Sequence, residues 1–264
     1  MTAGAAKRAL VTGAGKRLGR DMALYLGGRG YDVAVHFAGS EAEAEEVVQA
    51  LRGMGRRAGA LRADFLDEAQ VSGLMDRAQE ALGGPVTCLV NNASIFEYDN
   101  VHTATRASWD RHMESNLRAP FVLSQAMAAQ GVEAGKDAQG APCAAGLIVN
   151  MIDQRVRKLT PEFASYTIAK MGLWAMTQTL AQALAPAIRV NAIGPGPTLQ
   201  GARQSAAHFA AQRAATILKR GADPEEITAA LGYLLDAPSV TGQLICVDGG
   251  QHLGWQTPDV LGVE

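Results

Sequence analysis

Short apolar runs alternate with longer amphipathic stretches from one end of the chain to the other. Seven of these runs have the length of a strand and are rich in Val, Ile or Leu. They are Arg8–Val11, Val33–Phe37, Ala58–Ala63, Thr87–Val90, Gly146–Met151, Ile188–Ile193 and Gln243–Val247. Almost continuous apolar strands that alternate with helices are typical of a parallel sheet covered on both faces.

Helix-sized segments lie between most of the runs. They are Leu18–Arg29, Glu41–Arg52, Glu68–Leu82, Ala107–Ala129, Phe163–Leu184 and Pro224–Leu235. The alternation predicts an α/β fold: a single doubly wound Rossmann-type domain over residues 1–264, with a seven-stranded parallel sheet and right-handed crossovers. Ligands of such a sheet bind at the carboxyl ends of the strands, near the point where the strand order reverses.

Two segments fit neither pattern. Gln130–Ala145 is rich in Gly and Ala and contains Pro142, so we expect a mobile surface loop before the fifth strand. The stretch from Gly194 to about Ala206 is also irregular. Because it follows the sixth strand, it is expected to lie over the ligand crevice.

Charge, cysteine content and hydropathy exclude several classes of function. The 24 Lys and Arg nearly balance the 26 Asp and Glu, which leaves a net charge of −2 and no basic footprint for nucleic acid. The three cysteines, Cys88, Cys143 and Cys246, form neither a metal-ligand pair nor an even disulfide set, and Cys88 and Cys246 stand in apolar runs typical of buried thiols. Met1–Arg8 lacks the apolar stretch of a signal peptide, and no run approaches the ~20 residues of a membrane span. We therefore expect a cytoplasmic protein that binds no metal and no membrane.

A glycine-rich turn, Thr12 to Gly19, ends the first strand and opens a helix. Glycines such as Gly13 let the backbone approach a pyrophosphate, and the helix N-terminus favours the anion. This context indicates a dinucleotide site, although an ordinary strand-to-helix turn would give a similar pattern.

The end of the second strand favours NADP over NAD. An NAD site usually carries an acid there, whereas this strand ends in His36-Phe37-Ala38-Gly39-Ser40. Lys16 and Arg17 offer positive charge to a 2′-phosphate and Ser40 offers a hydroxyl, unless the two basic side chains are merely solvated.

Polar residues also follow the third and fourth strands. Asp64 could accept a hydrogen bond from an adenine amino group or simply cap a turn. Asn91 and Asn92 could tie neighbouring strand ends together, while Ala93 leaves room for the cofactor to pass.

Tyr166 and Lys170 stand four residues apart on one helix face. A free tyrosine has a pKa of about 10, and a nearby ammonium would lower it. Such a tyrosine can donate a proton in a transition state, and Lys170 could also hold the nicotinamide ribose. The spacing alone is common, so it needs support from other motifs.

That support comes from a resemblance. The chain resembles the short-chain dehydrogenases/reductases in the order and spacing of the following motifs: the glycine turn, Asn91-Asn92-Ala93, Asn116, Tyr166/Lys170, Arg189-Val190-Asn191, Pro195-Gly196, Thr241-Gly242 and Asp248-Gly249-Gly250. By this resemblance, Asn116 would support a water in the proton relay and Thr198 would contact the nicotinamide carboxamide. NADP(H) would be bound by Gly13, Lys16, Arg17, Leu18, His36, Ser40, Asp64, Phe65, Asn92, Ala93, Ser94, Lys170, Pro195, Gly196 and Thr198. The family often forms homotetramers through the helices at Ala107–Ala129 and Phe163–Leu184 and the last strand, whereas the tail Gln251–Glu264 could pack locally or reach a neighbour.

Two departures from the general family pattern are informative. Arg17 stands where glycine is usual, and Asp153 stands where a catalytic serine is usual. Both departures resemble the pteridine reductases and dihydromonapterin reductases. In that subgroup the pterin site would be lined by Arg17, Ser94, Phe96, Asp153 and Tyr166. Gly39 differs from the subgroup, which often has a basic residue near this position.

The carboxylate at Asp153 bears on the reaction. A serine hydroxyl can donate to a ketone oxygen as negative charge develops, whereas an ionised carboxylate cannot donate and would repel that charge. It can accept from the N–H groups of a nitrogen heterocycle, and Phe96 can add a stacking face. The sequence therefore predicts an NADPH-dependent enzyme that reduces a pterin-like C=N bond, with Tyr166, Lys170, Asp153 and Asn116 as catalytic residues. The alternatives are a ketone or 3-oxoacyl reductase, in which Asp153 only caps a turn, and a non-catalytic nucleotide-binding sensor.

Overall fold

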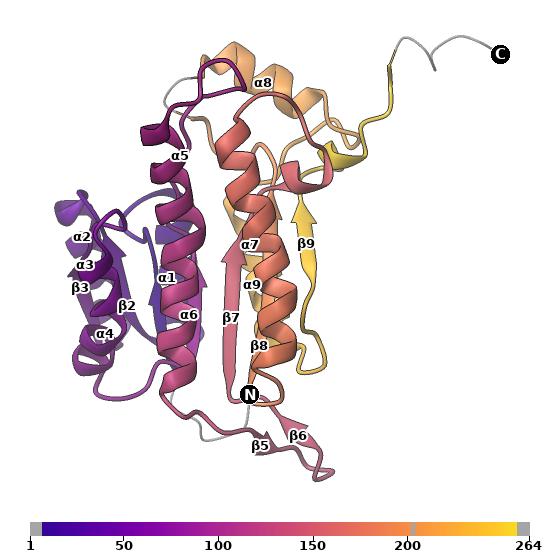
Figure 1. The fold of residues 1–264 in the computed structure, drawn as a ribbon. Helices are drawn as coiled ribbons and strands as arrows, with labels where there is room; N and C mark the ends of the chain where they lie inside the picture. The colour runs from indigo at the N-terminus through magenta and orange to yellow at the C-terminus, as the bar shows by residue number, and fades with distance from the viewer. Residues whose placement is uncertain (1–6, 202–203, 258–264) are drawn as a thin grey trace.

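Seven parallel strands form one twisted sheet (Figure 1) in a computed structural model, which describes residues 7–201 and 204–257. The spatial order is β3-β2-β1-β4-β7-β8-β9. The strands are β1 (Arg8–Val11), β2 (Asp32–Phe37), β3 (Ala58–Arg62), β4 (Cys88–Asn91), β7 (Gly146–Met151), β8 (Ile188–Pro195) and β9 (Leu244–Val247). The prediction of a seven-stranded parallel sheet is confirmed.

Helices cover both faces of the sheet, as the apolar strands require. One face packs against α1 (Arg17–Gly28), α2 (Glu41–Gly53) and α9 (Pro224–Asp236). The other face packs against α3 (Glu68–Ser72), α4 (Leu74–Leu82), α6 (Ala119–Ala129) and α7 (Ala164–Ala183). Two large apolar cores result, one on each side of the strands, and a smaller third cluster includes Val156, Leu173 and Leu244.

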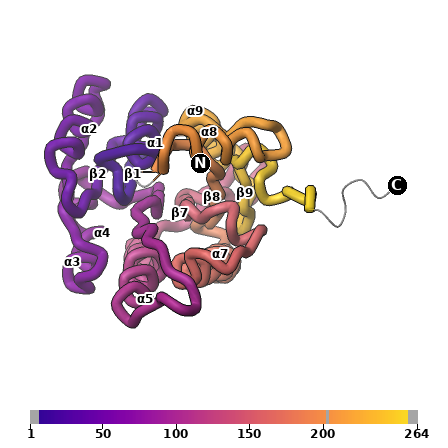
Figure 2. Tube along the Cα trace, turned by 90° about the horizontal axis from the view of Figure 1, so that it is seen from above, coloured from indigo at the N-terminus to yellow at the C-terminus, as the bar shows by residue number. Residues whose placement is uncertain are grey.

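The strand order reverses between β1 and β4, so a crevice opens at their carboxyl ends. Figure 2 views the molecule from this edge of the sheet, and α8 (Ala206–Ala214) lies across it. The 3₁₀ turn η2 (Gln154–Arg157) and the N-terminus of α7 reach the same edge.

Several boundaries differ from the predictions. Gly73 separates α3 from α4, which were expected as one helix. The helix expected over Ala107–Ala129 contains a π-helical turn, η1 (Glu114–Arg118), between α5 (Arg106–Met113) and α6. The segment expected to be a loop before β7 forms a short hairpin of β5 (Gly135–Lys136) and β6 (Pro142–Cys143). The helix α8 was not predicted, and none of its residues is buried.

After β9, residues Gln251–Leu253 form the 3₁₀ turn η3, which Asp248 holds by accepting from the backbone N–H of His252 at 2.8 Å. Residues 258–264 of the predicted tail lie outside the described residues. No helix among the described residues is long and apolar enough to cross a membrane.

Candidate active site

The glycine-rich turn forms a cradle that only small residues permit. Gly13 has φ +63°, and a Cβ on Gly19 would lie 2.2 Å from the carbonyl oxygen of Gly13. A cavity of about 420 Å³ opens against this turn. It is lined by Gly13, Lys16, Arg17, Leu18, Gly19, His36, Ala38, Asp64, Phe65, Leu66, Asn92, Ala93, Ser94, Ile95 and Ser115. The close backbone approach and the open cavity fit a dinucleotide pyrophosphate.

The His36 side chain supports the glycine-rich turn through hydrogen bonds. Its Nδ1 accepts from the Gly13 N–H at 3.0 Å, and its Nε2 contacts the Ala63 carbonyl oxygen at 3.0 Å. The first contact requires an unprotonated Nδ1, so Nε2 carries the proton. Burial lowers the pKa of His36 to about 4, and its ring stacks on Phe65 at 4.4 Å. His36 is therefore a neutral support of the turn, and it brings no positive charge to a phosphate at pH 7.

The strand ends on either side of the crevice are tied together, as predicted for the asparagines. The Asn92 side chain donates to the Thr12 carbonyl oxygen at 2.8 Å. The Thr12 hydroxyl in turn accepts from the backbone N–H groups of Asn92 and Ala93 at 2.8 and 2.9 Å. These bonds close the gap between β1 and β4 where the cofactor would cross.

The site expected to bind the cofactor 2′-phosphate offers less free positive charge and fewer polar groups than predicted. The Lys16 Nζ lies 2.6 Å from the carboxylate of Glu43, an acid on the first turn of α2 that the motifs in the sequence do not indicate. Ser40 is not among the residues that line the cavity. Asp64 faces it, and one of its carboxylate oxygens accepts from the Leu66 N–H at 3.0 Å. Asp64 thus caps a turn with one oxygen.

Asp153, Tyr166 and Lys170 meet at the end of β7 and form what we call the floor of the site. The Tyr166 hydroxyl donates to the Asp153 Oδ2 at 3.0 Å, and the Asp153 Oδ1 accepts from the Arg155 N–H at 2.8 Å. Lys170 donates to the Met151 carbonyl oxygen at 2.9 Å. Asp153 therefore caps η2 and contacts the proposed proton donor at once, which joins two roles that the sequence treated as alternatives.

Burial controls the proton affinities on the floor. Tyr166 and Lys170 are 5% and 2% exposed. Desolvation lowers the pKa of Lys170 to about 8. Desolvation, followed by the charge of Asp153, raises the pKa of Tyr166 well above its usual value. The predicted lowering of the tyrosine pKa by Lys170 is therefore wrong: the phenol is held protonated, as a proton donor requires.

The pKa of Asp153 is also raised, because its carboxyl group is surrounded by protein atoms even though the residue as a whole is only partly buried. The backbone N–H of Arg155 acts in the opposite direction. A carboxyl group with a raised pKa beside a phenol is suited to exchanging a proton with it.

An aromatic cluster stands beside the floor. The Phe96 ring meets the Tyr166 ring edge-on at 4.7 Å and stacks on Phe163 at 4.4 Å. The Arg155 guanidinium lies 5.1 Å from the centre of the Phe163 ring. Phe96 is 45% exposed and is therefore not a core residue. Phe163 and Arg155 were not predicted, since their contacts depend on how η2 meets α7.

Asn116 lies in η1 and lines neither the cavity at the glycine-rich turn nor a second cavity that opens beside the floor. Its side chain accepts from the Ile95 N–H and donates to the Ile95 carbonyl oxygen, both at 2.8 Å. The side chain that the resemblance assigns to a proton relay thus holds the segment next to Phe96. A π-helical turn at this residue agrees with the frequent use of such turns at functional sites.

A second cavity, of about 1300 Å³, extends from the floor to what we call the roof, residues 196–201 together with α8. Its lining includes Ser94, Phe96, Asp153, Tyr166, Lys170, Pro195, Gly196 and Thr198 among the predicted residues. The roof also contributes His208, Phe209 and Gln212, and Gln204, which lies between the two parts of the roof in sequence, lines the cavity as well. The irregular segment after β8 therefore lies over the crevice as expected.

Arg17 joins the cradle to the roof. Its guanidinium donates to the carbonyl oxygens of Gln200 at 2.8 Å and Leu199 at 3.0 Å. Its φ of +54° lies in the left-handed region, which accounts for the glycine usual at this position in the family that the sequence resembles. Arg17 lines both cavities, so it can contact ligands in each.

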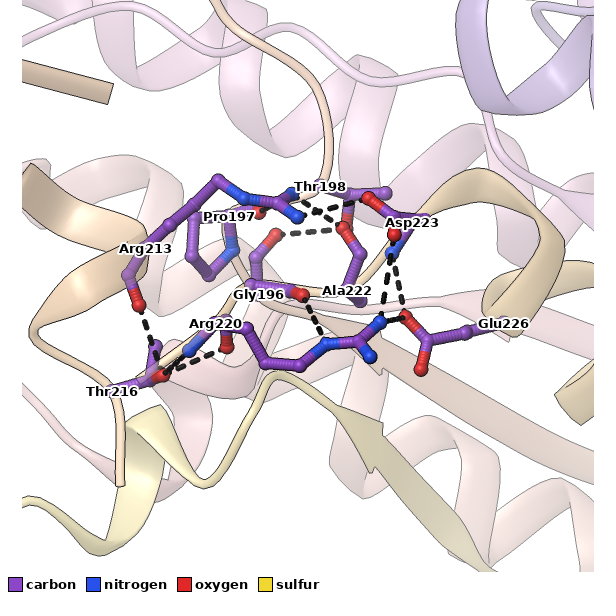
Figure 3. A network of polar contacts seen from close by, with 10 residues as sticks. Gly196, Pro197, Thr198, Arg213, Thr216, Arg220, Ala222, Asp223 and Glu226 are labelled. Atoms are coloured by element: carbon purple, nitrogen blue, oxygen red, sulfur yellow. Dashed lines mark hydrogen bonds and ion pairs between the residues drawn. The ribbon is translucent and has the colours of Figure 1, made fainter. Parts of the chain in front are cut away.

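A second arginine holds the base of the roof (Figure 3). Arg213 on α8 donates to the carbonyl oxygens of Pro197 at 3.1 Å and Ala222 at 2.7 Å, and to Asp223 at 2.9 Å. Pro197 lies between Gly196 and Thr198, two residues expected to bind the cofactor, of which Thr198 would contact the nicotinamide carboxamide. The sequence did not indicate Arg213, because its partners come from two separate segments, one at Pro197 and the other at Ala222 and Asp223.

Comparison with known proteins places these features in context. A family profile described as Enoyl-(Acyl carrier protein) reductase matches residues 13–252. A 3-oxoacyl-(acyl-carrier-protein) reductase FabG of Staphylococcus epidermidis is 31% identical over 252 residues, which are 94% of this chain and 99% of that protein.

Two solved structures share more of the sequence. FolM alternative dihydrofolate reductase 1 from Brucella suis, in complex with NADP, is 42% identical with a TM-score of 0.88. The protein of the same name from Brucella canis, also complexed with NADP, is 40% identical with a TM-score of 0.87. In both comparisons the match covers 97% of this chain and 98% of the other.

Proposed function

This chain belongs to the short-chain dehydrogenase/reductase family, and from that premise we propose that it reduces a pterin-like C=N bond with NADPH. The observation that carries the proposal is the Asp153 carboxylate, 3.0 Å from the Tyr166 hydroxyl. It places an acceptor for ring N–H groups where a ketone reductase of this family has a hydroxyl donor. The two FolM structures, whose name states a dihydrofolate reductase, support the same substrate class.

The enzyme uses NADP(H), in agreement with its structural relatives. The cradle at Gly13 and Gly19 would hold the pyrophosphate, and Arg17 would neutralise part of its charge. Lys170 would hold the nicotinamide ribose, with Thr198 at the carboxamide. When bound, NADPH supplies a hydride.

The floor supplies the proton. Tyr166 donates its phenolic proton to the substrate nitrogen while the adjacent carbon gains the hydride. A C–N single bond with one new C–H and one new N–H bond thus replaces the C=N double bond. The Asp153 Oδ2 accepts from the phenol before the reaction and stabilises N–H groups of the bound ring. Because its pKa is raised, Asp153 can afterwards take up a proton from solvent and pass it to the phenolate oxygen.

Phe96 and the roof define the substrate slot. The partly exposed Phe96 ring offers a flat substrate a stacking surface beside Tyr166, and Ser94 adds a hydroxyl. Arg17, which contacts the roof at Leu199 and Gln200, would reach both the substrate and the cofactor phosphate.

A ketone or 3-oxoacyl thioester is the second candidate, since FabG is a relative at 31% identity. A substrate panel separates the two. Purified enzyme is supplied with dihydropterins, dihydrofolate, quinonoid pterins, simple ketones and a 3-oxoacyl thioester, and oxidation of NADPH or NADH is followed. We expect pterin reduction and at least about tenfold tighter binding of NADPH than NADH, or about 1.4 kcal/mol. Reduction of ketones without reduction of any pterin would overturn the proposal.

Three further predictions remain part of the proposal. Residues 1–264 would form one domain, the protein would act in the cytoplasm, and four copies would assemble. The assembly is supported by Ile168 and Met171, which are 47% and 37% exposed on the long helix α7.

A further inference from the structure

A chain of buried polar groups runs behind the floor and lines neither cavity. It consists of His112 on α5, Ser165 on α7 and Asp99 in the loop after β4. Their exposed fractions are 0%, 1% and 1%. The proton transfer proposed above uses none of them, although Ser165 directly precedes Tyr166.

The hydrogen bonds determine the protonation of His112. Its Nε2 lies 3.1 Å from the backbone N of Glu97, which can only donate, so Nε2 is unprotonated. The proton is therefore on Nδ1, which lies 2.7 Å from the Ser165 Oγ. The Ser165 hydroxyl donates to Asp99, whose other oxygen accepts from the Ser165 N–H at 3.1 Å. Every link has one donor and one acceptor only when His112 is neutral.

This order excludes a nucleophilic triad. In a hydrolytic triad the histidine stands between serine and aspartate and accepts the serine proton. Here serine stands in the middle, and the free nitrogen of the histidine is engaged by a peptide N–H. Ser165 is also inaccessible to substrate.

The contacts of His112 hold neighbouring segments of the site in place. His112 and Asn116 are four residues apart and project toward the same segment. Asn116 binds both backbone groups of Ile95, and His112 binds the N–H of Glu97. The residue held between them is Phe96. Through Ser165, the same histidine reaches the residue next to Tyr166, and its ring lies edge-on to the Tyr166 ring at 5.9 Å.

We infer that His112 is a positioning residue: with Ser165 and Asp99 it fixes the stacking ring Phe96 relative to the proton donor Tyr166. The inference rests on the proposed function for the role of Phe96, but not for that of Tyr166. The surroundings of His112 favour its neutral form. Burial lowers its pKa, as do Arg111 and Lys170, against the opposing charges of Asp99 and Glu97.

The sharpest variant is Ser165→Ala, which breaks the chain in the middle and leaves His112 in place. Its matched control is Ser124→Ala on α6, since Ser124 is 1% exposed and loses one hydrogen bond, to the Pro120 carbonyl oxygen at 2.7 Å. We expect Ser165→Ala to raise the pterin KM about tenfold and to lower kcat about tenfold, because misplacement of reacting groups by ~1 Å can reduce rates up to about a hundredfold. The Kd for NADPH should stay within about twofold.

Two outcomes would overturn the inference. One is Ser165→Ala kinetics equal to those of Ser124→Ala at a similar loss of thermal stability. The other is independent of substrate: nitrogen chemical shifts of the wild-type imidazole, assigned with His112→Phe, that show a protonated Nε2 at pH 7. If the panel reveals a ketone substrate and no pterin, the fall in kcat is still expected with that ketone. The proposed function would then fail while the inference stands.

Discussion

On the floor of the second cavity, Tyr166 and Lys170 are almost fully buried, and each polar group bonds to a neighbour within a few residues of the β7 end. The roof is different. No residue of α8 is buried, and arginine bonds to backbone carbonyl oxygens attach the roof at Leu199, Gln200 and Pro197. On the floor, desolvation therefore sets the pKa values of the buried side chains. In the roof, directional hydrogen bonds set the position of the backbone segment, and a ligand can replace these bonds.

This contrast implies a division of labour. Changes on the floor should alter kcat, the pH dependence and the choice of reaction. Changes in the roof should alter the binding of cofactor and substrate and leave the chemical step largely intact. Substitutions on the floor and in the roof test the two sides of this division.

The largest effect is expected for Tyr166→Phe. The ring and its contact with Phe96 remain, but the proton is lost, so kcat should fall by roughly 10²- to 10⁴-fold. Binding of NADPH, followed by fluorescence titration, should change little. A variant with near wild-type kcat would remove Tyr166 from the floor chemistry.

Asp153→Ser should lower kcat/KM for a pterin by roughly ten- to a hundredfold, because a charge-assisted hydrogen bond contributes about 1.5–3 kcal/mol. Serine can still cap η2 at the Arg155 N–H, so the local fold should persist. Turnover of a simple ketone should change far less or improve. Asp153→Asn is the control, since it keeps the shape and removes the charge. Equal pterin turnover by wild type and Asp153→Ser would reduce Asp153 to a cap.

Lys170→Met tests whether desolvation lowers the pKa of Lys170. The quantity measured is the free energy of unfolding. The pKa of Lys170 is about 8 in the fold against 10.5 ordinarily. The unfolded chain thus binds more protons between these values, and the stability of the wild type rises with pH across this window. Below pH 8 the buried ammonium is unfavourable by ~3 kcal/mol. Methionine removes that cost but also a hydrogen bond of about 1 kcal/mol.

Urea unfolding of Lys170→Met at pH 7 should therefore show a free energy of unfolding ~1–3 kcal/mol higher than wild type, together with loss of turnover. The difference should shrink as the pH rises from 8 toward 10.5. A less stable variant at pH 7, or a difference that does not vary with pH, would mean that the ammonium is well compensated by its surroundings.

The smallest effect is expected in the roof. Arg213→Ala removes the bond to the Pro197 carbonyl oxygen and should raise the Kd for NADPH about tenfold, or about 1.4 kcal/mol, with kcat nearly unchanged. Arg220→Ala is the matched control, because Arg220 belongs to the same network in Figure 3 but binds Glu226 at 2.8 Å rather than the roof. If both variants bind NADPH equally well, Arg213 does not position the nicotinamide segment.

Local patterns carried the sequence predictions that held. The seven strands follow from runs of apolar residues, and the cradle follows from a glycine turn placed between a strand and a helix. Tyr166 and Lys170 share a helix face because they are four residues apart. Such features depend on neighbours within one or two turns of chain, and the spacing of residue types is sufficient to predict them.

Tertiary structure determined the long-range contacts and the burial of the same residues. Glu43 engages Lys16, Arg17 crosses to Gln200, and His112 reaches Ser165 only after distant segments meet at the sheet edge. The direction of the Tyr166 pKa shift was reversed for the same reason. The sequence placed a cation four residues away, but the folded chain buries the phenol and sets a carboxylate against it. Periodicity is a property of short segments, whereas desolvation and pairing depend on every segment that packs around a group.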